Sequence, residues 1–242
     1  MERDSNAFNR FLKYYWRYYR ELEKEFLSTA RYVEFVEDNF STYSVEFLKL
    51  YQAVCSEIDV VGKMMASKAN PAFNSESRNN NIYEWWYEIQ DSYYFTFTEE
   101  YSDAVKTNVD FQIKLQDVEC SFIDSYTVCP WKGFRTEISI ARGGRRHHRI
   151  VDGYSTPNWW SDYNYVKHKR TFASTGIPSR LNYSKANLKN VSYAFSALYV
   201  LEMAFMEAVG TQNDLEAFAD YSELFDKKSN MTTEEIENLF QE

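Results

Sequence analysis

The chain has 242 residues and a mass of 28.8 kDa, a length that suits one large domain or two small ones with a buried core. Hydrophobic residues make up 44% and charged residues 26% of the sequence, which excludes an intrinsically disordered chain. The net charge of −9 argues against a general nucleic-acid binder, and the aromatic content of 18% predicts a core rich in rings.

Several features of the sequence predict a cytoplasmic protein. The N-terminal residues lack the apolar stretch of a secretory signal. The longest apolar stretch, residues 194–209, contains Glu202 and Glu207 and is shorter than the ~20 residues of a membrane span. Three widely spaced cysteines favour free thiols over a disulfide framework. We therefore expect no membrane partner.

Charge is distributed unevenly along the chain. Residues 132–190 carry twelve basic and three acidic residues, whereas residues 191–242 carry two basic and eleven acidic residues. Two interpretations remain open: the basic segment faces the phosphates of a nucleic acid or nucleotide, or it pairs with the acidic segments around it. In a variant of the second interpretation, the acidic segment covers the basic one.

Hydrophobic periodicity predicts a mainly α fold. The expected helices share an apolar stripe at helical spacing, and they span residues 6–38, 44–67, 82–90, 158–169, 184–209, 213–225 and 233–240. Local signals set their starts: Ser44 and Thr156 are expected N-caps, Pro157 a first helical residue, and Ser184 the opening of the last long helix. That helix is apolar nearly all round, so we expect it to be the most buried.

The region between these helices, about 92–155, is expected to hold loops and short strands. Residues 111–116 alternate apolar and polar side chains, as a strand does. Residues 137–142 alternate more weakly, and the following Gly143-Gly144 pair predicts a β-hairpin.

We interpret the chain as a single domain with a four-helix core. Its four segments are a helical hairpin, a loop-rich insertion, the remainder of the bundle with a polar motif, and acidic C-terminal helices, at residues 1–67, 68–155, 156–210 and 211–242.

The densest polar cluster lies on the helix predicted over 158–169. Asn164 and His168 are four residues apart and share a helix face, while Lys167 and Arg170 share a neighbouring face. The cluster suits cleavage of a phosphodiester. His168 would act as general acid or base, Arg170 and Lys167 would stabilise the phosphorane, and Asn164 would orient His168 or bind an oxygen. Alternatively, these are basic residues of a last turn that offset the helix dipole and bond its final carbonyls.

Other residues extend this candidate site. Glu57 lies at the edge of a buried stripe, and we expect its carboxylate to reach His168 or Arg170 and tune the site. The hairpin tip carries a basic group that either contacts phosphates or is a solvated turn: Arg142, Arg145, Arg146 and Arg149.

Neither a metal nor a cofactor is expected. His147 and His148 are adjacent and point to opposite faces of a strand, and the cysteines form no CxxC pair. The sequence contains no phosphate-binding loop or dinucleotide fingerprint.

The sequence resembles the HEPN superfamily of α-helical bundles, which is common in bacterial toxin and phage-defence systems. The resemblance lies in the helical hairpin, the interruption after it, the run Asn164-Tyr165-Val166-Lys167-His168 on a helix, and the buried final helix. It also resembles an uncharacterised bacterial family in Tyr43-Ser44, in Ser56-Glu57-Ile58-Asp59 with Lys63, and in residues 159–170.

The HEPN resemblance implies a metal-independent RNase whose motif lies where two protomers meet. Family members carry an Arg, often followed by Asn, four to six residues before the His, and Tyr163 stands at that position here. This departure favours the alternative function: a non-enzymatic HEPN-like binding or regulatory protein that contacts nucleic acid, nucleotide or a partner protein through its basic segment. For the RNase we expect a homodimer.

Overall fold

A computed structural model of the chain describes residues 5–77, 80–91, 115–123, 126–140, 146–174 and 177–228. Within these ranges the fold is mainly α with small antiparallel sheets, as the periodicity predicts. The helices are α1 (Ser5–Phe11), α2 (Arg17–Ser28), α3 (Val45–Ala69), α4 (Ile82–Ile89), α6 (Asn158–Lys169), α7 (Leu188–Val209) and α8 (Gln212–Ala217). The strands are β1 (Glu119–Phe122), β2 (Tyr126–Val128), β3 (Thr136–Ile140), β4 (Arg146–Ile150), β5 (Ala173–Ser174), β6 (Ile177–Leu181) and β7 (Phe225–Lys228).

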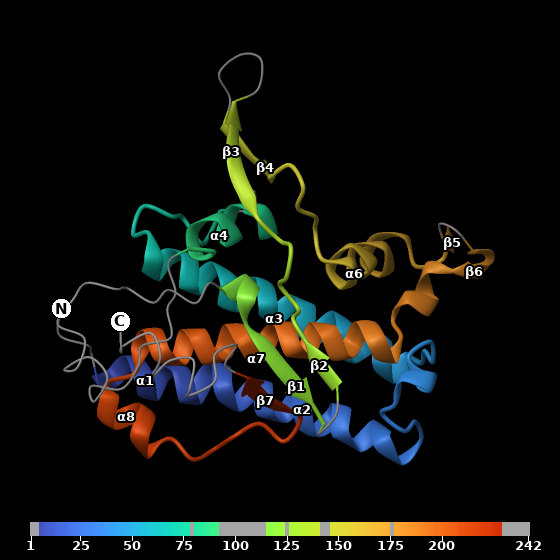
Figure 1. Cartoon of the computed structure of the whole chain (residues 1–242), viewed down its shortest axis with the longest axis horizontal. Coiled ribbons are helices and arrows are strands. Elements are labelled where there is room, and N and C mark those ends of the chain that lie inside the picture. The colour runs from blue at the N-terminus through green and yellow to red at the C-terminus, as the bar shows by residue number, and fades with distance from the viewer. Residues whose placement is uncertain are drawn as a thin grey trace, which may run out of the picture.

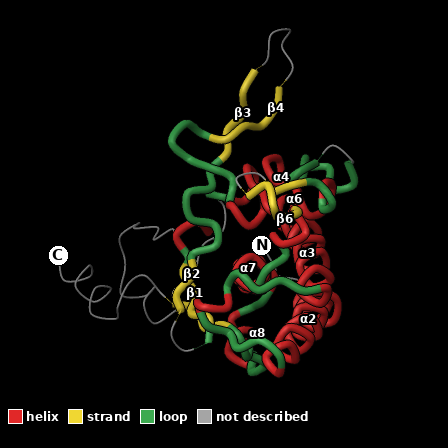
Figure 2. The backbone as a smooth tube through the Cα atoms, turned by 90° about the vertical axis from the view of Figure 1, so that its right-hand side faces the viewer, coloured by secondary structure: helices red, strands yellow, loops and turns green. Residues whose placement is uncertain are grey.

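Helix α7 lies at the centre of the core. It packs most extensively along α3 and also contacts α1, α2 and α6 (Figure 1). On its other side lies the sheet of order β2-β1-β7, so α7 runs between the sheet and α3 (Figure 2). Because α7 is apolar nearly all round and surrounded on several sides, the prediction of a deeply buried last helix is confirmed.

The first helix is shorter than the sequence predicts. It runs through α1, a π-helical segment (Leu12–Trp16) and α2, and ends at Ser28 rather than at residue 38. At this end the hydroxyls of Ser28 and Thr29 donate to backbone carbonyls one turn earlier, which competes with continuation of the helix. Phe35 still reaches the core from irregular backbone and stacks on Phe26, with ring centroids 4.6 Å apart.

The start of α3 is confirmed and two other helix starts need correction. Ser44 caps α3, with its hydroxyl accepting from the backbone N–H of Phe47 at 3.0 Å. Pro157 occupies the N-cap of α6 rather than its first helical position. Helix α7 begins at Leu188, because Asn187 rather than Ser184 accepts the capping hydrogen bond.

Thr156 does not cap α6. Its hydroxyl lies 3.0 Å from that of Tyr83 in α4, so it joins two helices that are far apart in the sequence. Ser184 belongs to a short 3-10 helix (Asn182–Lys185) that precedes α7.

The predicted hairpin is present, and the strand predicted over 111–116 is not confirmed. Strands β3 and β4 pair in antiparallel register and project from the helices (Figure 1). Their tip, with Arg142 and Arg145, lies outside the described residues. Residues 111–114 also lie outside them, and Leu115–Asp117 form a 3-10 helix.

The C-terminal helix predicted over 213–225 is present but ends earlier than the sequence predicts. Helix α8 ends at Ala217, and β7 pairs with β1 so that Phe225 lies opposite Phe122. The preceding loop is held by α2: the buried carboxylate of Glu23 accepts from the Ser222 hydroxyl and from the N–H groups of Glu223 and Leu224. The helix predicted over 233–240 lies outside the described residues.

Candidate functional site

Helix α6 presents one aromatic face to the core and one polar face to solvent. Trp159, Trp160, Tyr163 and Val166 are buried, whereas Asn164 is exposed. Two hydrogen bonds anchor the start of the helix: the Trp159 indole N–H donates to the Pro130 carbonyl at 3.0 Å, and the Tyr51 hydroxyl donates to the Trp159 carbonyl.

The last turn of α6 carries cations that face solvent. Lys167, His168, Lys169 and Arg170 are all exposed, and in the described part of the chain none of them forms an ion pair with a carboxylate. This differs from Lys185 nearby, which pairs with Asp162.

Other groups bond the carbonyls at this helix end. The Lys169 carbonyl accepts from the backbone N–H of Phe172 at 3.0 Å and from the side-chain amide of Asn182 at 2.9 Å. The Arg170 carbonyl accepts from the Tyr183 N–H at 3.0 Å. Neither carbonyl depends on the basic side chains, which therefore remain free to contact a ligand.

An exposed ring follows these cations. Phe172 keeps 64% of its surface exposed, and it comes two residues after Arg170 in the turn that leaves α6. We call this set of residues the α6-end surface: Lys167, His168, Lys169, Arg170 and Phe172. Exposed rings between unpaired cations are typical of surfaces that bind single-stranded nucleic acid.

The described part of the hairpin is different, because much of its positive charge is neutralised. Arg149 forms ion pairs with Glu137 at 2.6 Å and with Asp152 at 3.6 Å. At the hairpin base, Arg135 binds the Asp91 carboxylate with two hydrogen bonds. Arg146 is exposed. Of the two interpretations of the basic segment, pairing with acidic residues applies to Arg135 and Arg149. The basic residues at the end of α6 are exposed instead, so contact with phosphates stays open for them.

The structure places Glu57 in a different environment from the expected one. Besides desolvation by burial, the charge of its carboxylate contributes to the raised pKa values of Tyr15, Tyr18 and Glu202. Glu57 therefore lies on the side of α3 that faces the π-helical segment and α7. Cys55 and Asp59, two residues before and after it, line a pocket beside α6 instead, because residues two apart on a helix point in nearly opposite directions. Glu57 therefore lies with Glu202 rather than with His168.

Burial perturbs both of these carboxyl groups. Glu57 is half-buried, and desolvation raises its pKa to about 7. Glu202 is fully buried, and neither of its oxygens has a hydrogen-bond partner among the described residues. Desolvation, followed by the neighbouring Glu57 charge, raises the Glu202 pKa well above its usual value.

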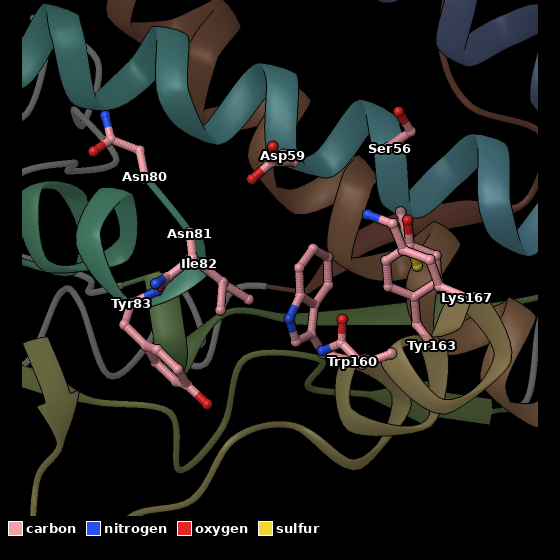
Figure 3. A pocket seen from close by; sticks show the side chains of 11 residues that line it. Ser56, Asp59, Asn80, Asn81, Ile82, Tyr83, Trp160, Tyr163 and Lys167 are labelled. Carbon is pink, nitrogen blue, oxygen red and sulfur yellow. The ribbon is translucent and has the colours of Figure 1, made fainter. Parts of the chain in front are cut away.

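A pocket of about 350 Å³ lies between α3, α4 and α6. We call it the α6 pocket; Figure 3 shows Ser56 and Asp59 from α3, Tyr83 from α4, and Trp160, Tyr163 and Lys167 from α6 around it. Of the four residues in the predicted polar motif, Asn164 and Lys167 line this pocket. His168 and Arg170 do not belong to its lining and lie on the α6-end surface alone.

Sequence reasoning missed the pocket because Trp160 and Tyr163 fit the buried stripe of an amphipathic helix. Both residues belong to the core and also line the pocket. The signal that could have found them is the clustering of Trp160, Tyr163, Asn164 and Lys167 at spacings of three and four.

No protein-family model, curated protein or solved structure matches the chain. Over the described ranges, no group of three or more His, Cys, Asp or Glu side chains is placed to hold a metal ion. None of the helices described is both long and apolar enough to cross a bilayer.

Proposed function

We propose that the protein binds single-stranded nucleic acid, RNA above all, through the α6-end surface. The observation that carries this proposal is the group of four exposed cationic or titratable side chains without carboxylate partners in the described structure, followed at once by the exposed Phe172 ring. Lysine and arginine would pair with phosphates, and the ring would stack on an unpaired base. Because pairing of these cations with phosphates releases counterions, we expect the binding to weaken as salt rises.

Fluorescence anisotropy with a labelled 12-nucleotide RNA tests this function. The double substitution Lys169→Gln and Arg170→Gln should weaken binding of all sequences alike. It should also reduce the steepness of log affinity against log salt concentration by about 1.4, at roughly 0.7 for each phosphate that the variant no longer neutralises. Phe172→Ser should weaken binding too, because stacking contributes about 1–3 kcal/mol per base.

Lys49→Gln is the matched control. Lys49 is exposed, lies on α3 and pairs with Glu46, so this change removes one positive charge elsewhere on the surface. Equal RNA affinity of the control and the α6-end variants would refute the proposed surface.

A metal-independent RNase is the second candidate, and one observation favours it. His168 is exposed on the same surface as Arg170 and one helical turn from Asn164, so its imidazole is open to a bound phosphodiester. His168 would transfer the proton, Arg170 and Lys167 would stabilise the phosphorane, and Asn164 would orient the site. A second copy of the chain would complete it.

Cleavage of labelled total RNA in EDTA separates the two functions. Cleavage by the wild type that His168→Ala loses, while still holding RNA, would establish the RNase. Folded wild-type protein that binds RNA without cutting it would leave the binding function alone.

The HEPN-like assignment and a role in bacterial phage defence or a toxin system belong to this proposal as well. Tyr163 stands at the position of the family's Arg and is buried, so that position offers no guanidinium to a phosphodiester, which supports the non-enzymatic form. Light scattering coupled to size exclusion would measure whether the protein is the homodimer that the RNase requires.

A further inference from the structure

The α6 pocket is lined by a buried tryptophan whose N–H has no acceptor in the described structure. The chain has six tryptophans, and the other five each donate their indole N–H to an oxygen: Trp16 to Asp220, Trp85 to Asp59, Trp86 to Phe134, Trp131 to Ala197 and Trp159 to Pro130. Trp160 is only 7% exposed and lines the pocket, yet no described residue accepts from it. The Trp160 N–H is not among the fully buried polar atoms that lack a partner, so this donor is open to the pocket and available to a ligand.

A second donor lies beside it. Tyr163 is 5% exposed, its ring centroid lies 5.3 Å from that of Trp160, and its hydroxyl has no hydrogen-bond partner within the described structure. Burial raises the Tyr163 pKa to about 12, so the hydroxyl keeps its proton and donates. The neighbouring Tyr51 hydroxyl is instead committed to the Trp159 carbonyl.

Two exposed polar side chains complete the α6 wall. The Lys167 ammonium lies 5.4 Å from the centre of the Tyr163 ring, and Asn164 is one turn earlier on the same pocket lining. Helix α6 therefore offers an indole N–H, a hydroxyl, an ammonium and an amide to the pocket. Such a set suits a ligand with several oxygen acceptors and a negative charge.

The opposite walls supply an acceptor and a ring. The Asp59 carboxylate of α3 accepts from Trp85 and Lys63, one hydrogen bond to each oxygen. Because a carboxylate can accept about four hydrogen bonds, it can also accept from a ligand. Tyr83 of α4 borders the space, and Figure 3 shows the Trp160 indole between Tyr83 and the pair Tyr163 and Lys167. A volume of about 350 Å³ is at the lower end for ligand pockets, which suits one small molecule.

We propose that the α6 pocket binds one nucleotide unit. The base lies against the rings of Trp160 and Tyr83, and Trp160 donates its N–H to a base or ribose oxygen. The phosphate accepts from Lys167 and Tyr163, and Asp59 accepts from an amino or hydroxyl group of the nucleotide.

This inference rests on the proposed function where the nucleotide belongs to a strand on the α6-end surface, because Lys167 is part of both sites. A free mononucleotide presents the same chemistry. A simple anion would use Lys167 but would leave the ring walls and the Asp59 carboxylate without a role.

Calorimetric titration distinguishes these sources. The probes are AMP, GMP, CMP and UMP, with inorganic phosphate as the anion without a base, and the labelled 12-nucleotide RNA is measured in parallel by anisotropy. Tyr163→Phe removes one hydroxyl from the pocket with almost no change in volume, and Trp160→Phe removes the indole N–H. Tyr51→Phe is the matched control, because it removes a buried hydroxyl from the adjoining ring, 5.8 Å away, that is bonded elsewhere.

We expect saturable binding of at least one mononucleotide, or of the RNA. Tyr163→Phe should weaken it about tenfold or more, since a hydrogen bond to the charged phosphate is lost, and Trp160→Phe should weaken it by about threefold to tenfold, since a hydrogen bond to a neutral oxygen is lost. Tyr51→Phe should lose stability and keep its affinity. If Tyr163→Phe binds every probe as tightly as Tyr51→Phe does, the inference is overturned. Inorganic phosphate that binds as tightly as the mononucleotides would overturn it too.

The two proposals fail in distinguishable ways. RNA binding that depends on Lys169 and Arg170 but not on Tyr163 would retain the proposed function and exclude the pocket. Mononucleotide binding that depends on Tyr163, in a protein that binds no RNA, would support the pocket and contradict the proposed function.

Discussion

Replacing Glu57 with glutamine should make the protein more stable above neutral pH. Glu57 lies half-buried beside the carboxyl of Glu202, and desolvation raises the Glu57 pKa from the usual 4.5 to about 7. In the folded state its proton is therefore held more tightly than in the unfolded chain. Stability from this group is fully present below about pH 4.5 and is lost as the pH rises through 7.

The size of the effect follows from the shift. A rise of about 2.5 units corresponds to roughly 3.4 kcal/mol at most, at about 1.36 kcal/mol per unit. Partial exposure of Glu57 to solvent reduces this, so we expect about 2–3 kcal/mol. Glutamine does not titrate, so Glu57→Gln should lie within about 1 kcal/mol of the wild type near pH 5 and exceed its stability by the full amount at pH 8.

Urea denaturation at pH 5, 6, 7 and 8 measures the difference in unfolding free energy between the two proteins. Glu46→Gln is the control, because Glu46 is an exposed carboxylate on the same helix that pairs with Lys49. Its difference from the wild type should stay within about 1 kcal/mol. A Glu57→Gln difference that does not change with pH would refute the argument that burial perturbs this carboxyl.

Two other substitutions test the packing that positions the site. Glu23→Ala should destabilise the protein by about 3–5 kcal/mol, because it removes the buried acceptor that holds Ser222 and Leu224. It should also expose residues 220–228 to limited proteolysis. Glu21→Ala, which changes an exposed neighbour, should have neither effect. Gly62→Ala should lower the free energy of unfolding, measured by thermal denaturation, by about 1–2 kcal/mol. The added methyl group would stand 2.6 Å from the Trp85 ring, and the cost of this overpacking exceeds the gain in helix propensity. A more stable variant would contradict this contact.

Much of the helical framework could be predicted from local pattern. Helix α3 begins after its predicted cap at Ser44, α6 spans the predicted residues, and β3 pairs with β4 as the Gly143-Gly144 signal suggests. These features depend on hydrophobic period, capping and turn chemistry, which neighbouring residues determine. The α7 stripe, apolar on nearly every face, likewise predicts its central position.

The errors arise where distant residues decide the structure. Residues 225–228 form strand β7 because β1, about a hundred residues earlier, offers an edge and Glu23 holds the loop before it. No local signal distinguishes that strand from a continued acidic helix. The expectation that Glu57 reaches His168 or Arg170 failed for the same reason, because the direction of this side chain depends on how α3 packs against α7.

For the candidate site, the sequence determined which chemistry lies on α6: a histidine, cations and an amide at helical spacing. Tertiary structure alone decided which of these groups remain available. It pairs Arg149 and Lys185 with carboxylates and leaves the last turn of α6 unpaired in the described structure. It also satisfies five indole N–H groups and leaves Trp160 to the pocket, because an acceptor is supplied by whichever distant segment packs there.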